Sequence, residues 1–179
     1  MNSFEVKELS LPGVFRINTK LHTDTRGFSA PVYHNELYKA LGIESAFATE
    51  FTSRSQKGVV RGFHYQRAPH MQDKLVRCSY GEIFDVAADC DPGSPTYGAS
   101  VGLHLNGDEQ GMLFIPGRYA NGFAVLSDIA IVEYKVSNEY HPELVSGARF
   151  DDPLLNIKWP LVGEPILSAL DKAWPPLSR

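Results

Sequence analysis

The sequence has few sulfur-containing residues and no long apolar run. Its 179 residues include 2 cysteines and 3 methionines. None of its apolar runs approaches the roughly 18 residues that indicate a membrane-spanning helix. The first residues, MNSFEVKELSLPG, lack the basic-then-apolar pattern of a signal peptide. We therefore expect no membrane association and a cytoplasmic location.

The two cysteines, Cys78 and Cys90, lie on strand-like segments and lack Cys-x-x-Cys spacing. This arrangement predicts reduced thiols in the core rather than a disulfide or a pair of metal ligands.

An excess of basic residues is also missing. The 17 lysines and arginines are outnumbered by 21 aspartates and glutamates, which gives a formal net charge of -4. This balance argues against nucleic acid as a partner, and a phosphate-bearing ligand would need a few placed basic side chains. The length and the 43% hydrophobic content predict a single domain over residues 1–179.

The sequence also lacks the signals of a metal site and of a nucleophilic active site. The 6 histidines include no His-x-His pair, and no acid stands at ligand spacing from His64, so we expect no metal. No glycine-flanked serine elbow is present, and neither cysteine opens a helix, which argues against nucleophilic catalysis. General acid–base chemistry without a cofactor remains.

Between residues 59 and 136, short runs rich in β-branched and aromatic residues alternate with glycine, proline or asparagine breaks. The runs are VVRGFHY, KLVRCSY, EIFDVAAD, SVGLHL, GMLFIP, GFAVL and IAIVEYKV. This pattern predicts an all-β antiparallel sandwich or barrel. Upstream, only ELYKALG near residue 36 looks helical, and the proline-rich tail from Asp152 is expected to hold little regular structure.

Alternation along two of these runs predicts which side chains face inward. In IAIVEYKV, Tyr134 shares the apolar face and should point into the barrel, whereas Glu133 and Lys135 fall on the other face. In KLVRC, Lys74 shares the face of Val76. Its amine should therefore lie at a strand mouth or inside a polar cavity.

The stretch RGFHYQ does not fit simple alternation. Arg61 and His64 are three residues apart, so a regular strand would send them to opposite faces. Gly62 permits a bulge that would bring both side chains inward. We therefore predict an irregular strand near Gly62.

Each candidate residue also has a purely structural interpretation. His64 suits a hydrogen-bonded core histidine, Tyr134 a core aromatic, Lys74 a lysine whose amine reaches solvent from a strand edge, and Asp171 a solvated loop acid. The functional interpretation depends on finding an imidazole, a phenol and an amine together on the inward faces of one barrel. That combination suits proton transfer.

The order of several segments resembles that of a known family. The segments are VVRGFHYQ, QDKLVRCSYGEIFDVAADCDPGSPTYG, FIPGRYANGFAVLSD, YKVSNEY, DDPLLNIKWP and LSALD. They resemble the dTDP-4-dehydrorhamnose 3,5-epimerase family of the cupin superfamily. The resemblance implies a homodimeric jelly-roll cupin that inverts C3 and C5 of a nucleotide-diphosphate-linked 4-keto-6-deoxy sugar, without a metal or redox cofactor. Both carbons adjoin the C4 ketone, so enolate formation acidifies their protons.

The resemblance also implies roles for individual residues. His64 matches the family's base and Asp171 the carboxylate that forms a dyad with it. Tyr134 matches the phenol that returns a proton from the opposite face, and Lys74 the ammonium that stabilises the enolate oxygen. The substrate-binding residues that it implies are Arg61, Arg26, Phe28, Gln66, Asn121, Tyr140 and Asp85.

One departure from the family falls within the expected pocket. Asn121 stands where the family usually shows a histidine. An asparagine can form hydrogen bonds, which we predict with Asp85, but it cannot carry a proton. His64 is then the only imidazole expected in the pocket, and a narrower activity at one carbon stays open.

Other departures fall where the family binds the base and phosphates. Ser29 and Pro31 replace an aromatic residue and a glutamate, Thr49 and Phe51 replace glutamine and asparagine, and Leu170 replaces a basic residue. These changes alter the hydrogen bonds offered to a pyrimidine. Thymidine, cytidine and guanosine carriers therefore stay open. So do a single-carbon epimerase, a 3,4-ketoisomerase and a non-catalytic sugar-binding cupin.

Overall fold

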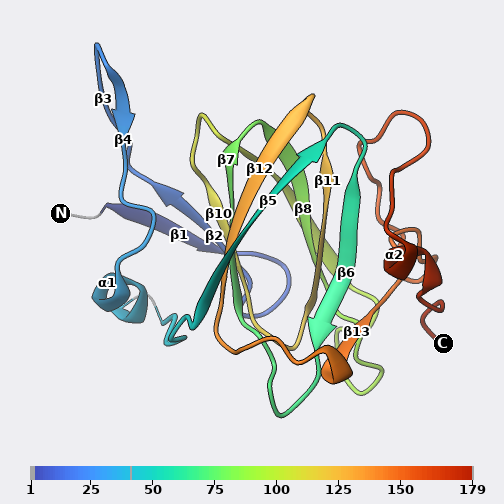
Figure 1. Ribbon diagram of the computed structural model, residues 1–179. Helices are drawn as coiled ribbons and strands as arrows, with labels where there is room; N and C mark the ends of the chain where they lie inside the picture. The colour runs from blue at the N-terminus through green and yellow to red at the C-terminus, as the bar shows by residue number, and fades with distance from the viewer. Residues whose placement is uncertain (1–2, 41, 179) are drawn as a thin grey trace.

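The structure is a computed structural model and describes residues 3–40 and 42–178. Two antiparallel sheets lie face to face, and a two-stranded hairpin projects from them (Figure 1). The elements are, in chain order, β1 (Phe4–Glu8), β2 (Phe15–Thr19), β3 (His22–Asp24), β4 (Gly27–Ser29), α1 (Asn35–Ala40), β5 (Thr49–Gln56), β6 (Val60–Gln66), β7 (Lys74–Tyr80), β8 (Glu82–Ala88), β9 (Ser100–Asn106), β10 (Met112–Ile115), β11 (Ala120–Val125), β12 (Ile129–Val136), the 3-10 turn η1 (Pro142–Leu144), β13 (Val145–Gly147) and α2 (Ala169–Ala173).

The larger sheet has the strand order β1-β2-β10-β7-β12-β5, and the other sheet has the order β13-β6-β11-β8-β9. Their inner faces enclose the main apolar core, which includes Val76, Ile83, Leu113 and Val132. Burial of this apolar surface is the main force that holds the sheets together. The predicted all-β fold is confirmed.

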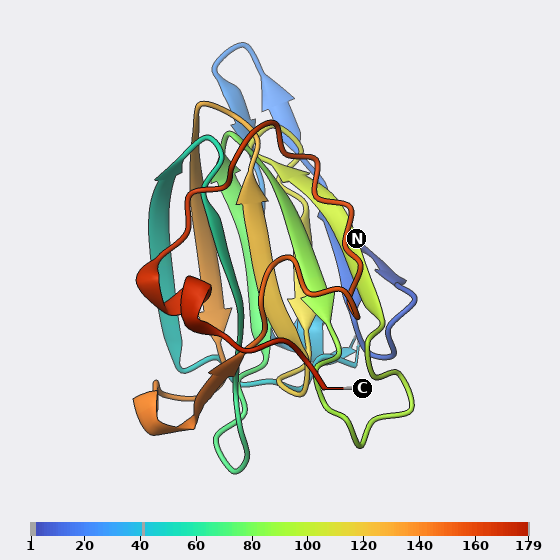
Figure 2. The same cartoon turned by 90° about the vertical axis from the view of Figure 1, so that its right-hand side faces the viewer.

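The outer faces of the sheets are covered by segments from the two ends of the chain. Tyr38 of α1 packs edge-on against Phe4, with ring centroids 5.3 Å apart, over the larger sheet. The C-terminal segment crosses the smaller sheet, where Trp159 contacts Phe63 (Figure 2). Within the described ranges, neither α-helix is long and apolar enough to cross a membrane.

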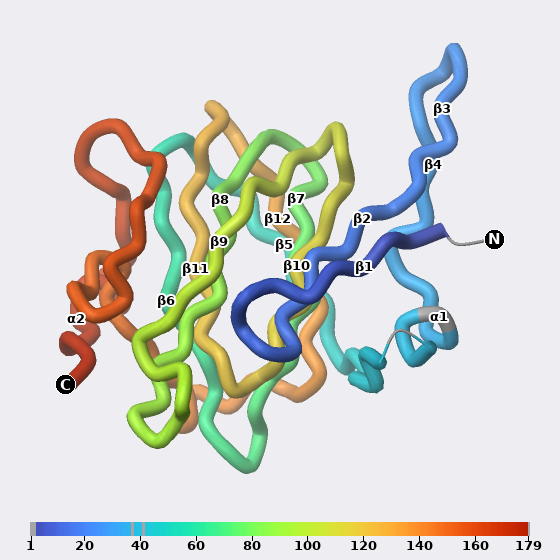
Figure 3. Tube along the Cα trace, turned by 180° about the vertical axis from the view of Figure 1, so that it is seen from behind, coloured from blue at the N-terminus to red at the C-terminus, as the bar shows by residue number. Residues whose placement is uncertain are grey.

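The β3–β4 hairpin extends away from both sheets, on the side opposite α2, as Figures 1 and 3 show from the front and from behind. All six residues of its two strands are exposed. The hairpin therefore makes little contribution to the core.

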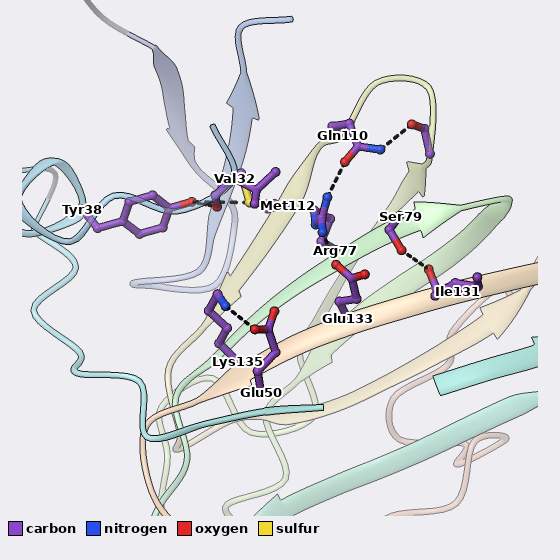
Figure 4. A network of polar contacts seen from close by, with 11 residues as sticks. Val32, Tyr38, Glu50, Arg77, Ser79, Gln110, Met112, Ile131, Glu133 and Lys135 are labelled. Carbon is purple, nitrogen blue, oxygen red and sulfur yellow. Dashed lines mark hydrogen bonds and ion pairs between the residues drawn. The ribbon is translucent and has the colours of Figure 1, made fainter. Parts of the chain in front are cut away.

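Polar side chains cover part of the outer face of the larger sheet (Figure 4). Glu133 pairs with Arg77, and Lys135 pairs with Glu50 at 2.7 Å. Both residues of β12 point outward, as alternation predicts, so Tyr134 between them points inward. The predicted faces of this strand are confirmed.

The seven predicted runs all form strands, and ELYKALG overlaps α1. Before residue 59, α1 is accompanied by the strands β1 to β5, which sequence analysis did not identify. Cys78 and Cys90 are free and buried, as predicted, and burial raises the pKa of their thiols to about 11 and about 12.

Candidate active site

A cavity of about 400 Å³ lies between the two sheets. Its walls come from β5, β7 and β12 of the larger sheet, from β6 and β11 of the smaller sheet, and from the start of α2. The lining residues are Phe51, Arg61, His64, Gln72, Lys74, Asn121, Phe123, Tyr134, Val136, Tyr140, Ser168 and Asp171. The four predicted catalytic residues, His64, Lys74, Tyr134 and Asp171, therefore share one cavity.

An irregularity in β6 brings Arg61 and His64 to the same cavity. Asn121 pairs with His64 and Phe123 pairs with Arg61, so β6 has one extra residue between these pairs. Gly62 and Phe63 together oppose Gly122 there; Gly62 has a φ of +110°, and a Cβ on it would lie 2.6 Å from the backbone oxygen of Asn121. A side chain would meet both a strained backbone and a clash. The predicted bulge at Gly62 is confirmed.

His64 is held by a carboxylate from the C-terminal segment. Its Nε2 lies 2.5 Å from Oδ1 of the buried Asp171. Burial alone raises the pKa of the Asp171 carboxyl, but hydrogen bonds from His64 and Ser168 outweigh it and hold that pKa below its ordinary value. The ionised carboxylate can therefore orient the imidazole and stabilise its protonated form.

The short helix α2 places Asp171 beside His64. Ser168 precedes the helix, and its Oγ accepts a hydrogen bond from the backbone N–H of Asp171 at 3.0 Å. The same hydroxyl donates to Oδ2 of Asp171 at 2.8 Å. This reciprocal N-cap fixes the carboxylate while its other oxygen faces the imidazole.

Lys74 presents a buried amine to the cavity from β7. The residue is only 8% exposed, and its Nζ makes a long contact of 3.5 Å with the backbone oxygen of Gln72. Burial lowers the pKa of the amine to about 8, while the charges of Asp73 and Asp85 act in the opposite direction. At neutral pH the amine remains a cation available to a developing oxyanion.

Tyr134 faces the cavity from β12. Its direct cross-strand partner is Phe51 of β5, and the two rings stack with centroids 5.4 Å apart. Burial raises the pKa of the phenol above its ordinary value, against the opposing charge of Arg61. The phenol therefore stays protonated well above neutral pH and can donate a proton.

Behind Asn121 lies the fully buried Asp85. The Asn121 amide donates to Oδ1 of Asp85 at 2.7 Å, which confirms the predicted hydrogen bond. Burial raises the pKa of Asp85 to about 7, although Asn121, Val86 and Lys74 each lower it. Asp85 does not line the cavity, so it can act there only through its neighbours.

Three predicted substrate-binding residues take distinct positions around the cavity. Arg61 lines it and donates to Ser55 at 3.1 Å, and Tyr140 lines it with 62% of its surface exposed. Gln66 is buried beside a smaller adjoining cavity. Its amide binds the backbone of His70, Glu139 and His141, so Gln66 joins two loops rather than facing the main cavity.

Arg26 and Phe28 lie on the projecting hairpin and not in the cavity of their own chain. Arg26 forms an exposed ion pair with Asp24. Phe28 borders a larger hollow of about 700 Å³ whose charged lining residues, Glu82, Asp108 and Glu109, are all acidic. Among the described residues, that hollow is lined by no histidine, lysine or arginine, whereas the smaller cavity is lined by His64, Lys74 and Arg61. Substrate binding by Arg26 and Phe28 therefore stays a prediction.

Several lining residues were missed by sequence analysis as site residues. The pattern Ser-x-x-Asp at Ser168 is a helix-capping signature and could have indicated the α2 start. Phe51 stood out only as a departure from the family, and Gln72 carries no local signal. Gln72 donates to the backbone of Asn138 and Glu139 and so fixes the loop that carries Tyr140.

Within residues 3–40 and 42–178, no three His, Cys, Asp or Glu side chains are grouped so that they could hold a metal ion.

Comparison with known proteins places the chain in a family. The family described as dTDP-4-dehydrorhamnose 3,5-epimerase matches residues 8–179. The relative of that name from Methanothermobacter thermautotrophicus is 41% identical to this chain, and the alignment covers 99% of this chain and 96% of the relative's length. A crystal structure of dTDP-6-deoxy-D-glucose-3,5-epimerase from Legionella pneumophila, in complex with dTDP-4-keto-L-rhamnose, aligns with a TM-score of 0.93 at 40% identity, over 97% of this chain and 93% of the other.

A 3'-monoepimerase from Streptomyces bikiniensis, in complex with dTDP-quinovose, also aligns, with a TM-score of 0.89 and 30% identity over 94% of this chain and 86% of the other. The neighbours thus include both double and single epimerases. The chain belongs to the dTDP-4-dehydrorhamnose 3,5-epimerase family of carbohydrate epimerases, and its all-β fold is the predicted cupin jelly roll.

Proposed function

We propose that the chain inverts C3 and C5 of a 4-keto-6-deoxy sugar carried on a nucleoside diphosphate, with dTDP as the first carrier to test. One observation supports this proposal above the others. The His64–Asp171 dyad faces the cavity from the smaller sheet, and Tyr134 faces it from the larger sheet. Inversion needs a base and an acid on opposite faces of a carbon, and this arrangement supplies both.

Each inversion is a proton exchange next to the ketone. His64 takes the proton from C3 or C5, the electron pair moves to the C4 oxygen, and an enolate forms. Tyr134 then protonates the same carbon from the other side while the carbonyl is restored. His64 is left protonated and Tyr134 ionised, and exchange with solvent resets both groups. His64 can release its proton because 38% of its side chain is exposed.

Lys74 is assigned to the negative charge of the enolate. Its β7 strand lies next to β12, with Lys74 opposite Val136, so the amine and the Tyr134 phenol belong to the same wall. A cation in a partly water-excluded cavity stabilises an oxyanion more strongly than it would in water. Arg61 supplies a second positive charge, suited to a phosphate.

The test is proton exchange in deuterated water. Wild-type protein should place deuterium at C3 and C5 of the dTDP-linked 4-keto sugar and change the configuration. His64→Ala should lose both signals, since a positioned base contributes roughly 10²–10⁴-fold. Tyr134→Phe should retain exchange at the original configuration but lose inversion, because only the opposite-face donor is removed.

His104→Ala is the matched control. His104 is also an imidazole paired with a carboxylate, Glu82, but it lies on β9 outside the cavity. Its loss should leave exchange unchanged. Exchange that persists in His64→Ala, or disappears equally in His104→Ala, would contradict the proposal.

A single-carbon epimerase is the second candidate. Asn121 favours it, because an amide cannot take up a proton and the cavity then has one imidazole, His64. The mass of the product and the positions of its deuterium label distinguish a double epimerase from a single-carbon epimerase. Label at C3 and C5 supports the double epimerase, and label at one carbon supports the narrower activity.

We further propose that the chain acts in the cytoplasm as a homodimer of single-domain subunits. The exposed hairpin would then carry Arg26 and Phe28 to the cavity of the second subunit, where the arginine suits a phosphate. Arg26→Ala should raise the KM for the nucleotide sugar with a smaller change in kcat, and light scattering should give a dimer mass. A monomeric mass with full activity would refute this arrangement.

A further inference from the structure

The Asn121 side chain has a fixed orientation. Its Nδ2 lies 2.7 Å from Oδ1 of Asp85 and 3.1 Å from the backbone oxygen of Val86. Turning the amide over would direct its oxygen at the Val86 carbonyl, which can only accept a hydrogen bond. Both amide protons are therefore used by β8.

The amide oxygen is the part of Asn121 that remains for a ligand. Asn121 lines the cavity, and within the described part of the chain no donor binds its Oδ1. The fixed amide therefore offers the cavity an acceptor and no donor. A hydroxyl can satisfy it, whereas a fluorine or an ether oxygen cannot.

The position of Asn121 indicates which part of the sugar it meets. Asn121 is the direct cross-strand partner of His64, and both side chains face the cavity. Side chains of such partners are neighbours on one face of a sheet. The Asn121 side chain thus neighbours His64, the proposed base, on the wall of the cavity.

We propose that Asn121 determines substrate specificity by accepting a hydrogen bond from a sugar hydroxyl at C2 or C3, beside the site of proton abstraction. The proposal rests on the proposed function, because it requires a sugar in this cavity. Asn121 takes no part in moving the proton, and it selects sugars that carry a hydrogen-bond donor at that position.

Binding and exchange are measured with the 4-keto sugar nucleotide and with analogues in which fluorine replaces the C2 or the C3 hydroxyl. Fluorine has a similar size but cannot donate. Wild-type protein should bind the parent sugar roughly 10- to 100-fold more tightly than one of the analogues, because that analogue leaves the Asn121 oxygen unpaired. In Asn121→Leu, which keeps the branched shape but removes the acceptor, the ratio should fall to about two or less.

The matched control is Asn18→Leu, which removes an asparagine of β2 outside the cavity and should keep the wild-type ratio. Asn121→His serves if the leucine variant does not fold, because an imidazole can still donate to Asp85. Its other nitrogen accepts at pH 8 and donates once the ring is protonated, so the preference should weaken at about pH 5.5. The preference of wild-type protein for the parent sugar over the analogue should not weaken between pH 8 and about pH 5.5.

Retention of the hydroxyl preference in Asn121→Leu, or a pH-independent preference in Asn121→His, would overturn the proposal. So would equal binding of all three sugars by wild type. Calorimetric binding needs no turnover, so these outcomes are distinct from failure of the proposed function. That failure would appear as wild-type protein that binds the parent sugar but exchanges no proton.

Discussion

Replacing Lys74 by methionine should make the protein less active and more stable at neutral pH. The amine is almost fully buried, and burial lowers its pKa from 10.5 to about 8. The difference corresponds to about 3 kcal/mol of unfavourable free energy for the protonated form at pH 7. Methionine has a similar shape without the charge, so the variant should gain stability up to this amount.

The pH dependence of that gain has a definite sign. Between pH 8 and pH 10.5 the unfolded chain binds the Lys74 proton while the folded chain has lost it. The free energy of unfolding of wild type should therefore rise with pH relative to Lys74→Met, and the two proteins should converge near pH 10.5. The raised pKa values of Cys78 and Cys90 make the free energy of unfolding fall with pH over part of this range. Both proteins contain these thiols, so their contribution cancels when the two free energies of unfolding are subtracted.

Activity should change in the opposite direction over the same range. Loss of the cation removes roughly 3–4 kcal/mol of oxyanion stabilisation, or about 10²–10³-fold in exchange rate. Wild-type exchange should thus fall above pH 8, about tenfold per pH unit, toward the low and pH-independent rate of Lys74→Met. Burial raises the pKa of the Tyr134 phenol above its ordinary value, so Lys74 loses its proton at lower pH than Tyr134 does.

The assay combines deuterium incorporation between pH 6 and pH 10 with urea unfolding between pH 6 and pH 10.5. Lys135→Met is the control, because Lys135 pairs with Glu50 on the outer face of the neighbouring strand. The exchange rate of Lys135→Met should decrease above pH 8 as the wild-type rate does. An alkaline fall that survives in Lys74→Met, or wild-type stability that declines relative to this variant, would refute the reasoning.

Two further perturbations test the groups that support the dyad and Asn121. Asp171→Asn should lower exchange by roughly 10- to 100-fold, because His64 loses a charged hydrogen-bond partner, whereas Ser168→Ala should mainly lower stability, by about 1 kcal/mol, through loss of the helix cap. Exchange rates and urea unfolding measure both. Asp85→Asn should become more stable than wild type as pH rises from 4 to 7, by up to about 4 kcal/mol, because the folded-state pKa of about 7 exceeds the unfolded value of 3.8. A difference in free energy of unfolding between Asp85→Asn and wild type that does not change with pH would contradict the cost assigned to burying the Asp85 carboxylate.

Burial distinguishes several strands that sequence analysis found from some that it missed. Strands β7, β8, β10 and β12 carry alternating or continuous buried residues, which is the signal that pattern analysis detects. Strands β3 and β4 are exposed on both faces, and only one residue of β5 is buried. Hydrogen bonding and register, rather than an apolar face, define these strands. Their sequences therefore resemble loops.

The site was predictable to a different degree for each residue. Alternation alone gave the inward direction of Tyr134 and Lys74, and Gly62 indicated that His64 could turn inward. Asp171 could be placed only through the family resemblance, because 107 residues separate it from His64 and no local pattern links them. The fixed direction of the Asn121 amide needed coordinates, since the sequence does not show which of its atoms meet β8.

The buried charges also bear on whether this cupin is a catalyst or only binds a sugar. A site that only binds the neutral sugar gains little from an amine that costs about 3 kcal/mol to bury when an apolar residue would fill the same space. Nor does it need an imidazole with a carboxylate at 2.5 Å on one wall and a phenol on the other. Enolate formation uses all of these groups, and the negative charge that develops in the cavity offsets the cost of burying Lys74. The unfavourable burial of Lys74 is therefore expected of a catalyst and unexplained in a binding protein.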